Sequence, residues 1–309
     1  MKGPLFYAKI LLFGEYGIIK DSKGLTIPYN SYQGALKKSK NLTAKAKKSN
    51  KSLERFFVYL NDLDEKEALN FRFEALKNDI DTGMYFDSSI PQGYGVGSSG
   101  ALVASIYDKY AIDKITVLEN LTREKLLKLK DIFSLMESFF HGNSSGLDPL
   151  NSYLSIPILI NSKDNLEPTG IPSQKEGKGA VFLLDSEMIG ETGPMVNIFM
   201  NKMKNEGFRR MLNEDFAKHT DACIEDFLHG NVKSLFGNVK QLSKVVLDNF
   251  KPMIPKAFHT VWQKGIETND YYLKLCGSGG GGYILGFTKD FDKAKAILKD
   301  YNLELVYRF

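Results

Sequence analysis

Cysteine is scarce in this chain, with only Cys223 and Cys276 among its 309 residues. Two cysteines cannot build a disulfide framework, and neither has the CxxC or Cys/His spacing of a metal site. The four histidines also lack metal-ligand spacing. These absences exclude a disulfide-rich scaffold and a zinc module, and they favour a reducing compartment.

A long apolar run is also missing. The apolar N-terminal stretch is interrupted by Lys9, is followed by no small-residue cleavage site and is far too short to span a membrane. The composition, 43% hydrophobic and 25% charged, is that of an ordinary globular protein. We therefore expect a cytoplasmic protein with no membrane partner.

Charge of one sign is not in excess, because 41 basic against 37 acidic residues give a net charge of only +4. This balance argues against a nucleic-acid partner. Seven lysines gather between positions 37 and 51, but no aromatic residue lies among them to stack on bases. For this segment we predict a solvated, mobile loop or hairpin.

Glycine is the residue that the chain does use in a distinctive way. In the stretch PQGYGVGSSG at 91–100, which we call the first glycine loop, three glycines recur at every second position and two serines follow. Glycine lets the backbone lie flat against a ligand, because no Cβ stands in the way. Ser98 or Ser99 is placed to cap a following helix, whose N-terminus would direct N–H groups and a positive dipole end toward the loop. The stretch predicts a phosphate site, with a plain connection as the alternative.

A second glycine-rich element, the tetraglycine loop at 277–282, lies between two apolar segments that we predict to be strands. Four consecutive glycines are costly to order. They are expected where two backbones pass very close, or where backbone presses against a ligand. A flexible linker is the alternative.

The remaining pattern predicts alternating strands and helices. Two strands with a tight connection are expected over 6–19, a partly helical stretch over 65–84, and a strand over 85–90 that leads into the first glycine loop. Helices are expected from 99 to about 111 and from Thr122 to His141, with Gly142 at the C-terminus of the second. The elements expected after it are a polar turn at 143–149, strands over 153–160, 180–184, 271–275, 283–287 and 303–309, and helices over 196–203, 214–228, 232–250 and 291–300.

Polar residues rich in Pro and Gly at 161–179 are the best candidate linker. They divide the chain into two expected domains, 1–165 and 166–309. The N-terminal one carries the first glycine loop.

Three stretches resemble the ordered motifs of the GHMP kinases, namely KILLFGEY at 9–16, PQGYGVGSSGA at 91–101 and KLCGSGGGGY at 274–283. This family includes galactokinase, homoserine kinase, mevalonate kinase, phosphomevalonate kinase and the related diphosphomevalonate decarboxylases. Within it the chain is most similar to mevalonate kinase, because HGNSSGLDP at 141–149 resembles that branch's SG[IV]D element. Glu137 precedes Asp148 by 11 residues (148 − 137). It lies about one turn before the expected end of its helix, so its carboxylate can reach the loop that follows.

The resemblance implies an α+β fold of two domains, the first like domain 2 of ribosomal protein S5 and the second ferredoxin-like. It implies ATP-dependent phosphorylation of a small-molecule hydroxyl, with mevalonate converted to 5-phosphomevalonate for isoprenoid synthesis. Phosphomevalonate kinase or another small-molecule kinase of the family is the alternative. A more remote alternative is a non-catalytic nucleotide-binding regulator on the same fold. The resemblance also allows a homodimer.

The resemblance further implies roles for individual residues. Asp148 would face the substrate hydroxyl with Lys9 beside it, and Glu137 would hold Mg²⁺ with the hydroxyl of Ser99. The ATP phosphates would be cradled by Gly93, Gly95, Gly97, Ser98, Ser99 and Gly100. The expected substrate contacts are Glu15, Tyr16, Thr192, Gly279 and Gly280.

These residue types suit phosphoryl transfer, which depends mainly on positioning and charge stabilisation. Mg²⁺ takes one or two carboxylate or hydroxyl oxygens and keeps its other positions for phosphate and water. A carboxylate aimed at the attacking hydroxyl either takes its proton or orients it, and both roles stay open for Asp148. Two departures concern the acceptor. Tyr16 stands where mevalonate kinases commonly have histidine, and Gly190 stands where they often have arginine.

Overall fold

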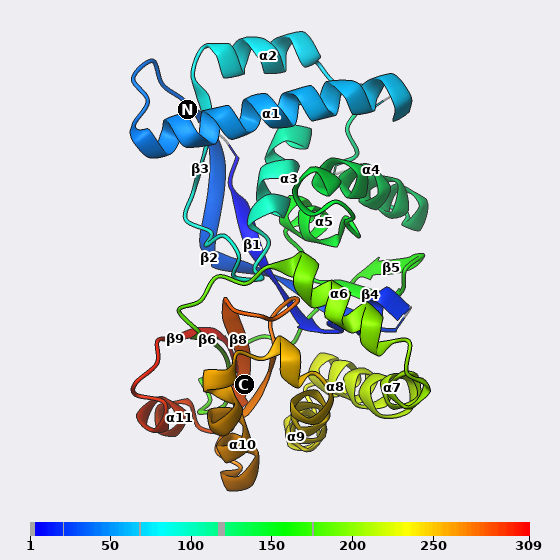
Figure 1. The fold of residues 1–309 in the computed structure, drawn as a ribbon, viewed down its shortest axis with the longest axis vertical. Coiled ribbons are helices and arrows are strands. Elements are labelled where there is room, and N and C mark those ends of the chain that lie inside the picture. Colours follow the sequence, from blue (N-terminus) through cyan, green and yellow to red (C-terminus); the bar gives the residue numbers. More distant parts are fainter. Residues whose placement is uncertain (1–3, 21, 68, 117–120, 175) are drawn as a thin grey trace. The chain divides into compact units, whose positions relative to one another are not determined.

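The computed structural model describes residues 4–20, 22–67, 69–116, 121–174 and 176–309. The chain forms two compact units (Figure 1). Unit 1 comprises Met1–Lys9, Pro28–Pro91 and Gly97–Ile156, and unit 2 comprises Ile10–Ile27, Gln92–Val96 and Pro157–Phe309. The division into domains 1–165 and 166–309 stays a prediction. In the described part of the chain, no helix is long and apolar enough to cross a membrane.

Unit 1 contains the first residues of β1 (Phe6–Phe13), most of β2 (Gly24–Lys38) and β3 (Met84–Ser88). β2 and β3 pair antiparallel, with Gly34 opposite Ser88 and Lys38 opposite Met84. The helices of this unit are α1 (Ala44–Glu67), α2 (Phe73–Asp81), α3 (Ser98–Tyr110), α4 (Arg123–His141) and α5 (Leu147–Leu154). α1 packs against β3, and α3 packs against both α4 and α5 (Figure 1).

An aromatic cluster fixes the mutual arrangement of α3, α4 and α5. The rings of Tyr107, Phe133 and Tyr153, one from each helix, contact one another edge to face at centroid distances of 5.0, 5.2 and 5.6 Å. Such pairs stabilise by about 0.5–1.5 kcal/mol beyond their buried area. The same three helices carry Ser99, Glu137 and Asp148, so this core holds the candidate site residues in place.

Unit 2 is built on a four-stranded antiparallel sheet. Its strands are β6 (Ala180–Asp185), β7 (Tyr272–Leu275), β8 (Tyr283–Thr288) and β9 (Leu303–Arg308), in the order β7-β8-β6-β9. Helices separate β6 from β7, and α11 (Phe291–Ile297) separates β8 from β9, which gives the βαββαβ topology of a ferredoxin-like fold. β6, β7 and β8 are buried along almost their whole length, so the sheet forms the core of this unit.

The other elements of unit 2 surround this sheet. α9 (Val232–Asn249) and α10 (His259–Thr268) pack on β7, and Trp262 of α10 is fully buried, as a core anchor should be. A hairpin of β4 (Ile158–Ser162) and β5 (Asn165–Pro168) pairs through β4 with residues 24–26 of β2. The remaining helices are α6 (Thr192–Lys202), α7 (Glu206–Met211), α8 (Ala217–Leu228), the π-helical turn η2 (Leu212–Phe216), and the 3-10 turns η1 (Gly17–Lys20), η3 (Lys251–Met253) and η4 (Lys256–Phe258).

The strand that leads into the first glycine loop, the strands of the second half and the long helices are confirmed within a few residues. α4 begins after Thr122, whose hydroxyl accepts a hydrogen bond from the Lys125 N–H, and ends at Gly142 with φ 73°. These signals are local, because a cap is chosen by its own side chain or by its own permitted φ.

Other expectations were wrong. Residues 17–20 form η1 and not a second strand, since Gly14 (φ 111°) and Tyr16 (φ 60°) reverse the chain. The lysine-rich segment 37–51 is not one loop, because only residues 39–43 are irregular. Lys37 and Lys38 end β2, where they pair with Asp87 and Asp79, and the residues from 44 onward belong to α1. Residues 147–154 form α5 and not the start of a strand, and the expected linker at 161–179 contains the end of β4 and all of β5.

Candidate functional site

The C-terminal end of the first glycine loop lies in unit 1, where α3 begins. Its N-cap is Gly97 with φ 81°, so the expectation that Ser98 or Ser99 caps the helix was wrong. A left-handed φ at this position favours glycine over serine. Both serines are therefore the first helical residues, and the Ser99 hydroxyl donates to Oε1 of Glu137 at 2.8 Å.

Glu137 lies on α4, and its carboxylate is buried in unit 1, with only 3% of the residue's surface exposed. Its Oε2 accepts a second hydrogen bond from the Ser144 hydroxyl at 2.6 Å. Burial, reinforced by the nearby carboxylate of Asp148, raises the pKa of Glu137 to about 7, although both serine hydrogen bonds and Lys9 act in the opposite direction. The surroundings of Glu137 thus compensate its negative charge only in part, which suits a bound cation.

Asp148 lies in the first turn of α5, after an N-cap at Gly146 with φ 72°. Its Oδ1 lies 2.9 Å from Nζ of Lys9, which comes from β1. The Lys9 side chain is 5% exposed and the Asp148 side chain 35%. The lysine is therefore held inside unit 1, whereas the carboxylate has an open side from which a reactant can approach.

Two glycines of the loop make this arrangement possible. A Cβ on Gly97 would lie 3.0 Å from Cγ of Lys9, so the lysine stem packs directly on the loop backbone. A Cβ on Gly100 would lie 2.7 Å from backbone atoms of Asp148 and Pro149, so α3 and α5 approach more closely than alanine allows. The structure thus brings Lys9, Ser99, Glu137 and Asp148 together from four elements.

The metal-ligand chemistry of this cluster is sparse. Across the described residues, no group of three or more His, Cys, Asp or Glu side chains is placed to hold a metal ion. Glu137 and Ser99 are one carboxylate and one hydroxyl, a set that fits Mg²⁺, because this ion keeps most of its positions for phosphate and water.

The N-terminal part of the first glycine loop lies in unit 2, where it packs on the tetraglycine loop. A Cβ on Gly95 would lie 2.5 Å from the carbonyl oxygen of Cys276, and one on Gly282 would lie 2.5 Å from Cα of Tyr94. The Gly93 carbonyl accepts from the Gly190 N–H at 2.9 Å. The expectation that two backbones pass very close at the tetraglycine loop is confirmed.

Gly190 lies where three loop segments of unit 2 meet. A Cβ there would be 3.0 Å from the Gly279 carbonyl oxygen and 3.2 Å from those of Gly281 and Gly93. The preceding turn also holds the tetraglycine loop, since the Gly282 N–H donates to the Met188 carbonyl at 2.5 Å. A side chain such as arginine therefore has no room at this position while the loops keep this packing.

The remaining predicted substrate contacts also lie in unit 2. Thr192 is exposed at the start of α6, and the Ser278 hydroxyl lies 3.4 Å from its hydroxyl. Gly279 is buried and Gly280 is partly exposed. Tyr16 is buried, and its hydroxyl donates to the Ser278 carbonyl at 2.6 Å.

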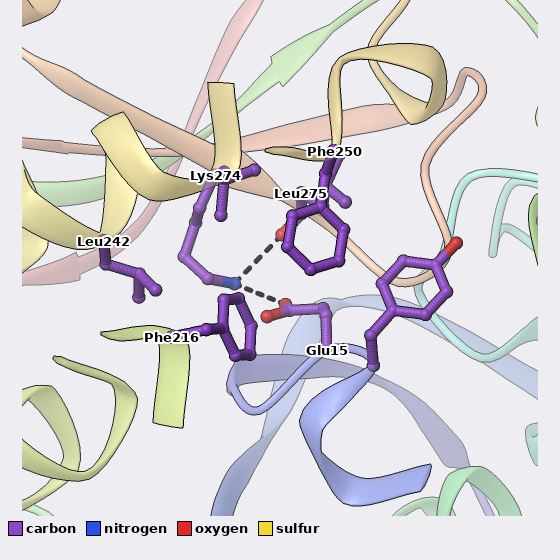
Figure 2. A pocket seen from close by; sticks show the side chains of 8 residues that line it. Glu15, Phe216, Leu242, Phe250, Lys274 and Leu275 are labelled. Carbon is purple, nitrogen blue, oxygen red and sulfur yellow. Dashed lines mark hydrogen bonds and ion pairs between the residues drawn. The ribbon is translucent and has the colours of Figure 1, made fainter. Parts of the chain in front are cut away.

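Glu15 is buried beside Lys274, with 4% and 2% of their surfaces exposed, and the two side chains form an ion pair (Figure 2). Sequence reasoning gave Lys274 no role, although a lone lysine inside the apolar strand YYLKLC is the same signal that Lys9 gives. The cavity beside this pair is about 10 Å³, room for about one water molecule and far too small for a metabolite.

Residues 65–155 match the family model of the GHMP kinases N terminal domain. No curated protein sequence matches the chain.

Several solved structures have a similar fold. L. major mevalonate kinase in complex with R-mevalonate is 17% identical with a TM-score of 0.64, covering 97% of this chain and 93% of its own. S. pneumoniae phosphomevalonate kinase, in complex with phosphomevalonate and AMPPNP, is 13% identical with a TM-score of 0.62, covering 98% and 99%. L. lactis galactokinase complexed with galactose is 12% identical with a TM-score of 0.57, covering 98% and 92%.

At these identities the structural likeness establishes the fold, and the family-model match establishes the N-terminal domain. Mevalonate and phosphomevalonate kinases predominate among the similar structures. Residues 65–155 therefore carry the N-terminal domain of the GHMP kinases, and the chain has the α+β fold of the similar structures.

Proposed function

We propose that this protein is an ATP-dependent kinase that phosphorylates a hydroxyl group of mevalonate to give 5-phosphomevalonate. The observation that carries the proposal is the convergence of Lys9, Ser99, Glu137 and Asp148 in unit 1, with the Lys9–Asp148 ion pair at 2.9 Å and the Ser99–Glu137 hydrogen bond at 2.8 Å. Phosphoryl transfer needs positioned charge and little covalent chemistry from the protein, and this cluster supplies that.

In this proposal Asp148 faces the attacking hydroxyl. Its partial exposure leaves room for the acceptor, and Lys9 holds the carboxylate in one orientation from its buried side. The carboxylate either accepts the hydroxyl proton or aligns the oxygen with the γ-phosphorus. In either role the ion pair with Lys9 holds the carboxylate in place.

GHMP kinases use ATP, and we assign its phosphates to the first glycine loop, from Gly93 to Gly100. Glu137 and the Ser99 hydroxyl would hold Mg²⁺, which would neutralise charge on the β- and γ-phosphates. The raised pKa of Glu137 supports this assignment, because a cation at that carboxylate would offset both its burial and the neighbouring charge of Asp148.

The choice of mevalonate rests on the SG[IV]D-like element at 145–148 and on the mevalonate kinases among the similar structures. Phosphomevalonate kinase is the second candidate, because a phosphorylated acceptor needs additional lysine or arginine. Lys37 and Lys38, two of the lysines that could serve, are already paired with Asp87 and Asp79. This favours the acceptor without a phosphate. The predicted acceptor contacts stay predictions, namely Glu15, Tyr16, Thr192, Gly279 and Gly280. A cytoplasmic location and a homodimer also stay predictions.

The test is coupled ADP release with Mg·ATP and four acceptors side by side, namely mevalonate, 5-phosphomevalonate, homoserine and galactose. Release with mevalonate alone would support the proposal. Release of ADP with 5-phosphomevalonate alone would contradict the choice of mevalonate and identify the protein as a phosphomevalonate kinase, the second candidate. Silence with all four, from protein that binds ATP, would contradict both and favour a non-catalytic nucleotide-binding regulator.

A further inference from the structure

Among the ion pairs described above, the pair between Lys274 and Glu15 is the most deeply buried. The two side chains are 3% and 5% exposed, and the lysine also donates to the Leu275 carbonyl at 2.9 Å. Figure 2 shows the pair among the apolar side chains of Phe216, Leu242 and Phe250. None of the roles proposed above requires Lys274.

Stability alone is a poor explanation for this pair. Taking two charges out of water costs about as much as their attraction returns, and well-packed apolar residues of similar volume are often as stabilising. A buried ion pair does define geometry, however, because each charge has one place in which it is compensated. The pair therefore fixes the backbone of Glu15 relative to strand β7.

The backbone that is fixed in this way is a tight turn. Gly14 has φ 111° and Tyr16 has φ 60°, and the Gly17 N–H donates to the Glu15 carbonyl at 2.6 Å. A left-handed φ is uncommon for a bulky residue and persists only where its surroundings enforce it. The ion pair that holds Glu15 in this turn therefore also fixes the position of the Tyr16 Cα and Cβ atoms.

Tyr16 connects this turn to the tetraglycine loop. Its ring stacks on Phe199 at 4.7 Å and contacts Phe250 at 5.7 Å, and its hydroxyl donates to the Ser278 carbonyl at 2.6 Å. Burial, with a smaller contribution from Glu15, raises the pKa of this phenol, so it remains a hydrogen-bond donor at neutral pH.

The bond to the Ser278 carbonyl orients a whole peptide group. In a planar trans peptide the N–H of the next residue, Gly279, points opposite to that carbonyl. Within the described part of the chain, the Gly279 N–H donates to no protein acceptor, whereas those of Gly280 and Gly282 donate to the Met253 and Met188 carbonyls. Gly279 is a buried residue, and a backbone N–H of such a residue without a protein acceptor is rare. Its direction is set by the Ser278–Gly279 peptide, whose carbonyl Tyr16 holds.

We infer that Lys274 and Glu15 form a positioning pair which, through Tyr16, sets the Ser278–Gly279 peptide so that the Gly279 N–H is directed at a reactant oxygen. This inference rests on the proposed kinase function for the identity of that reactant. The orientation of the loop is a property of unit 2 that can be measured without any substrate.

The first variants to compare are Lys274→Met, which keeps the stem and removes the charge, and Tyr16→Phe, which removes one oxygen atom. The matched control is Lys293→Met, which breaks the exposed Lys293–Asp270 pair of the same unit. Amide hydrogen exchange followed by mass spectrometry would report on the peptide that contains residues 277–282. We expect its exchange to rise at least 10-fold in Lys274→Met and Tyr16→Phe relative to the global opening rate, and to stay unchanged in Lys293→Met.

Kinetics give the second readout. We expect kcat to fall 10- to 100-fold in Lys274→Met and Tyr16→Phe, because an ångström of misplacement costs roughly that factor, while the Kd for ATP changes less than threefold. If Lys274→Met does not fold, loop exchange and kcat measured on Tyr16→Phe test the positioning role instead. Unchanged loop exchange in the folded variants would overturn the positioning pair even if the enzyme is a kinase. Raised loop exchange in a protein that phosphorylates none of the acceptors would support the pair and contradict the proposed function.

Discussion

Gly100 is the position where one added carbon atom should separate the residues of the unit 1 cluster. An alanine Cβ would lie 2.7 Å from the carbonyl carbon of Asp148 and from the nitrogen of Pro149. Ordinary contact begins at 3.4 Å, so α3 and α5 must move apart by about 0.7 Å. Both neighbours are backbone atoms, which cannot rotate away as a flexible side chain can.

Two opposing effects decide the stability of Gly100→Ala. Alanine is favoured over glycine inside a helix by about 1 kcal/mol, and overpacking a tight contact costs about 1–3 kcal/mol. The variant should therefore lose no more than about 2 kcal/mol. Activity should suffer far more, because moving Asp148 by most of an ångström relative to Ser99 costs roughly 100-fold in kcat.

The matched control is Gly237→Ala, the same change inside α9 at a position where an added Cβ meets no atom within 4 Å. It should gain about 1 kcal/mol and leave kcat unchanged. Thermal unfolding and initial rates of ADP release, measured on both variants, separate the two effects. Wild-type kcat in Gly100→Ala would refute the reasoning that the close approach of α3 and α5 positions Asp148.

Three further predictions follow from the same structure. Asp148→Asn should abolish turnover and leave ATP affinity, measured by calorimetry, nearly unchanged; wild-type turnover would remove Asp148 from its assigned role. Burial raises the pKa of Glu137 from 4.5 to about 7, so the folded chain binds this proton more tightly than the unfolded chain. Without Mg²⁺, the free energy of unfolding should therefore fall as pH rises from 4.5 to about 7, by on the order of 3 kcal/mol, and this fall should vanish in Glu137→Gln. Gly190→Ala should destabilise by about 1–2 kcal/mol, because its Cβ meets three carbonyl oxygens. Gly193→Ala, with no atom within 4 Å of the added Cβ, should be nearly neutral in the same denaturation experiment.

The sequence predicted well what is decided locally. The cap at Thr122, the glycine that ends α4 and the apolar strands of unit 2 are all specified within a few residues. The sequence also predicted that Glu137 and Asp148 lie near one another, as the structure has them. A helix end followed by a short loop leaves few ways to place the two carboxylates.

Features decided by distant contacts were missed. The pairing of Lys274 with Glu15 joins residues 259 positions apart, and no local pattern predicts it. The helical state of 147–154 was hidden because Asp148-Pro149 is a turn signal, whereas proline is also tolerated in the first turn of a helix. In the sequence, Gly190 stood out only because similar kinases often have arginine there. The structure explains the glycine, because three carbonyl oxygens surround the place that a Cβ would take.

The most direct measurement of the central claim is transfer of label from [γ-³²P]ATP to mevalonate, with wild-type protein and Asp148→Asn side by side. The account predicts a labelled monophosphate of mevalonate from the wild type and none from the variant, although both bind ATP. Absence of transfer from the wild type, or equal transfer by both proteins, would contradict it.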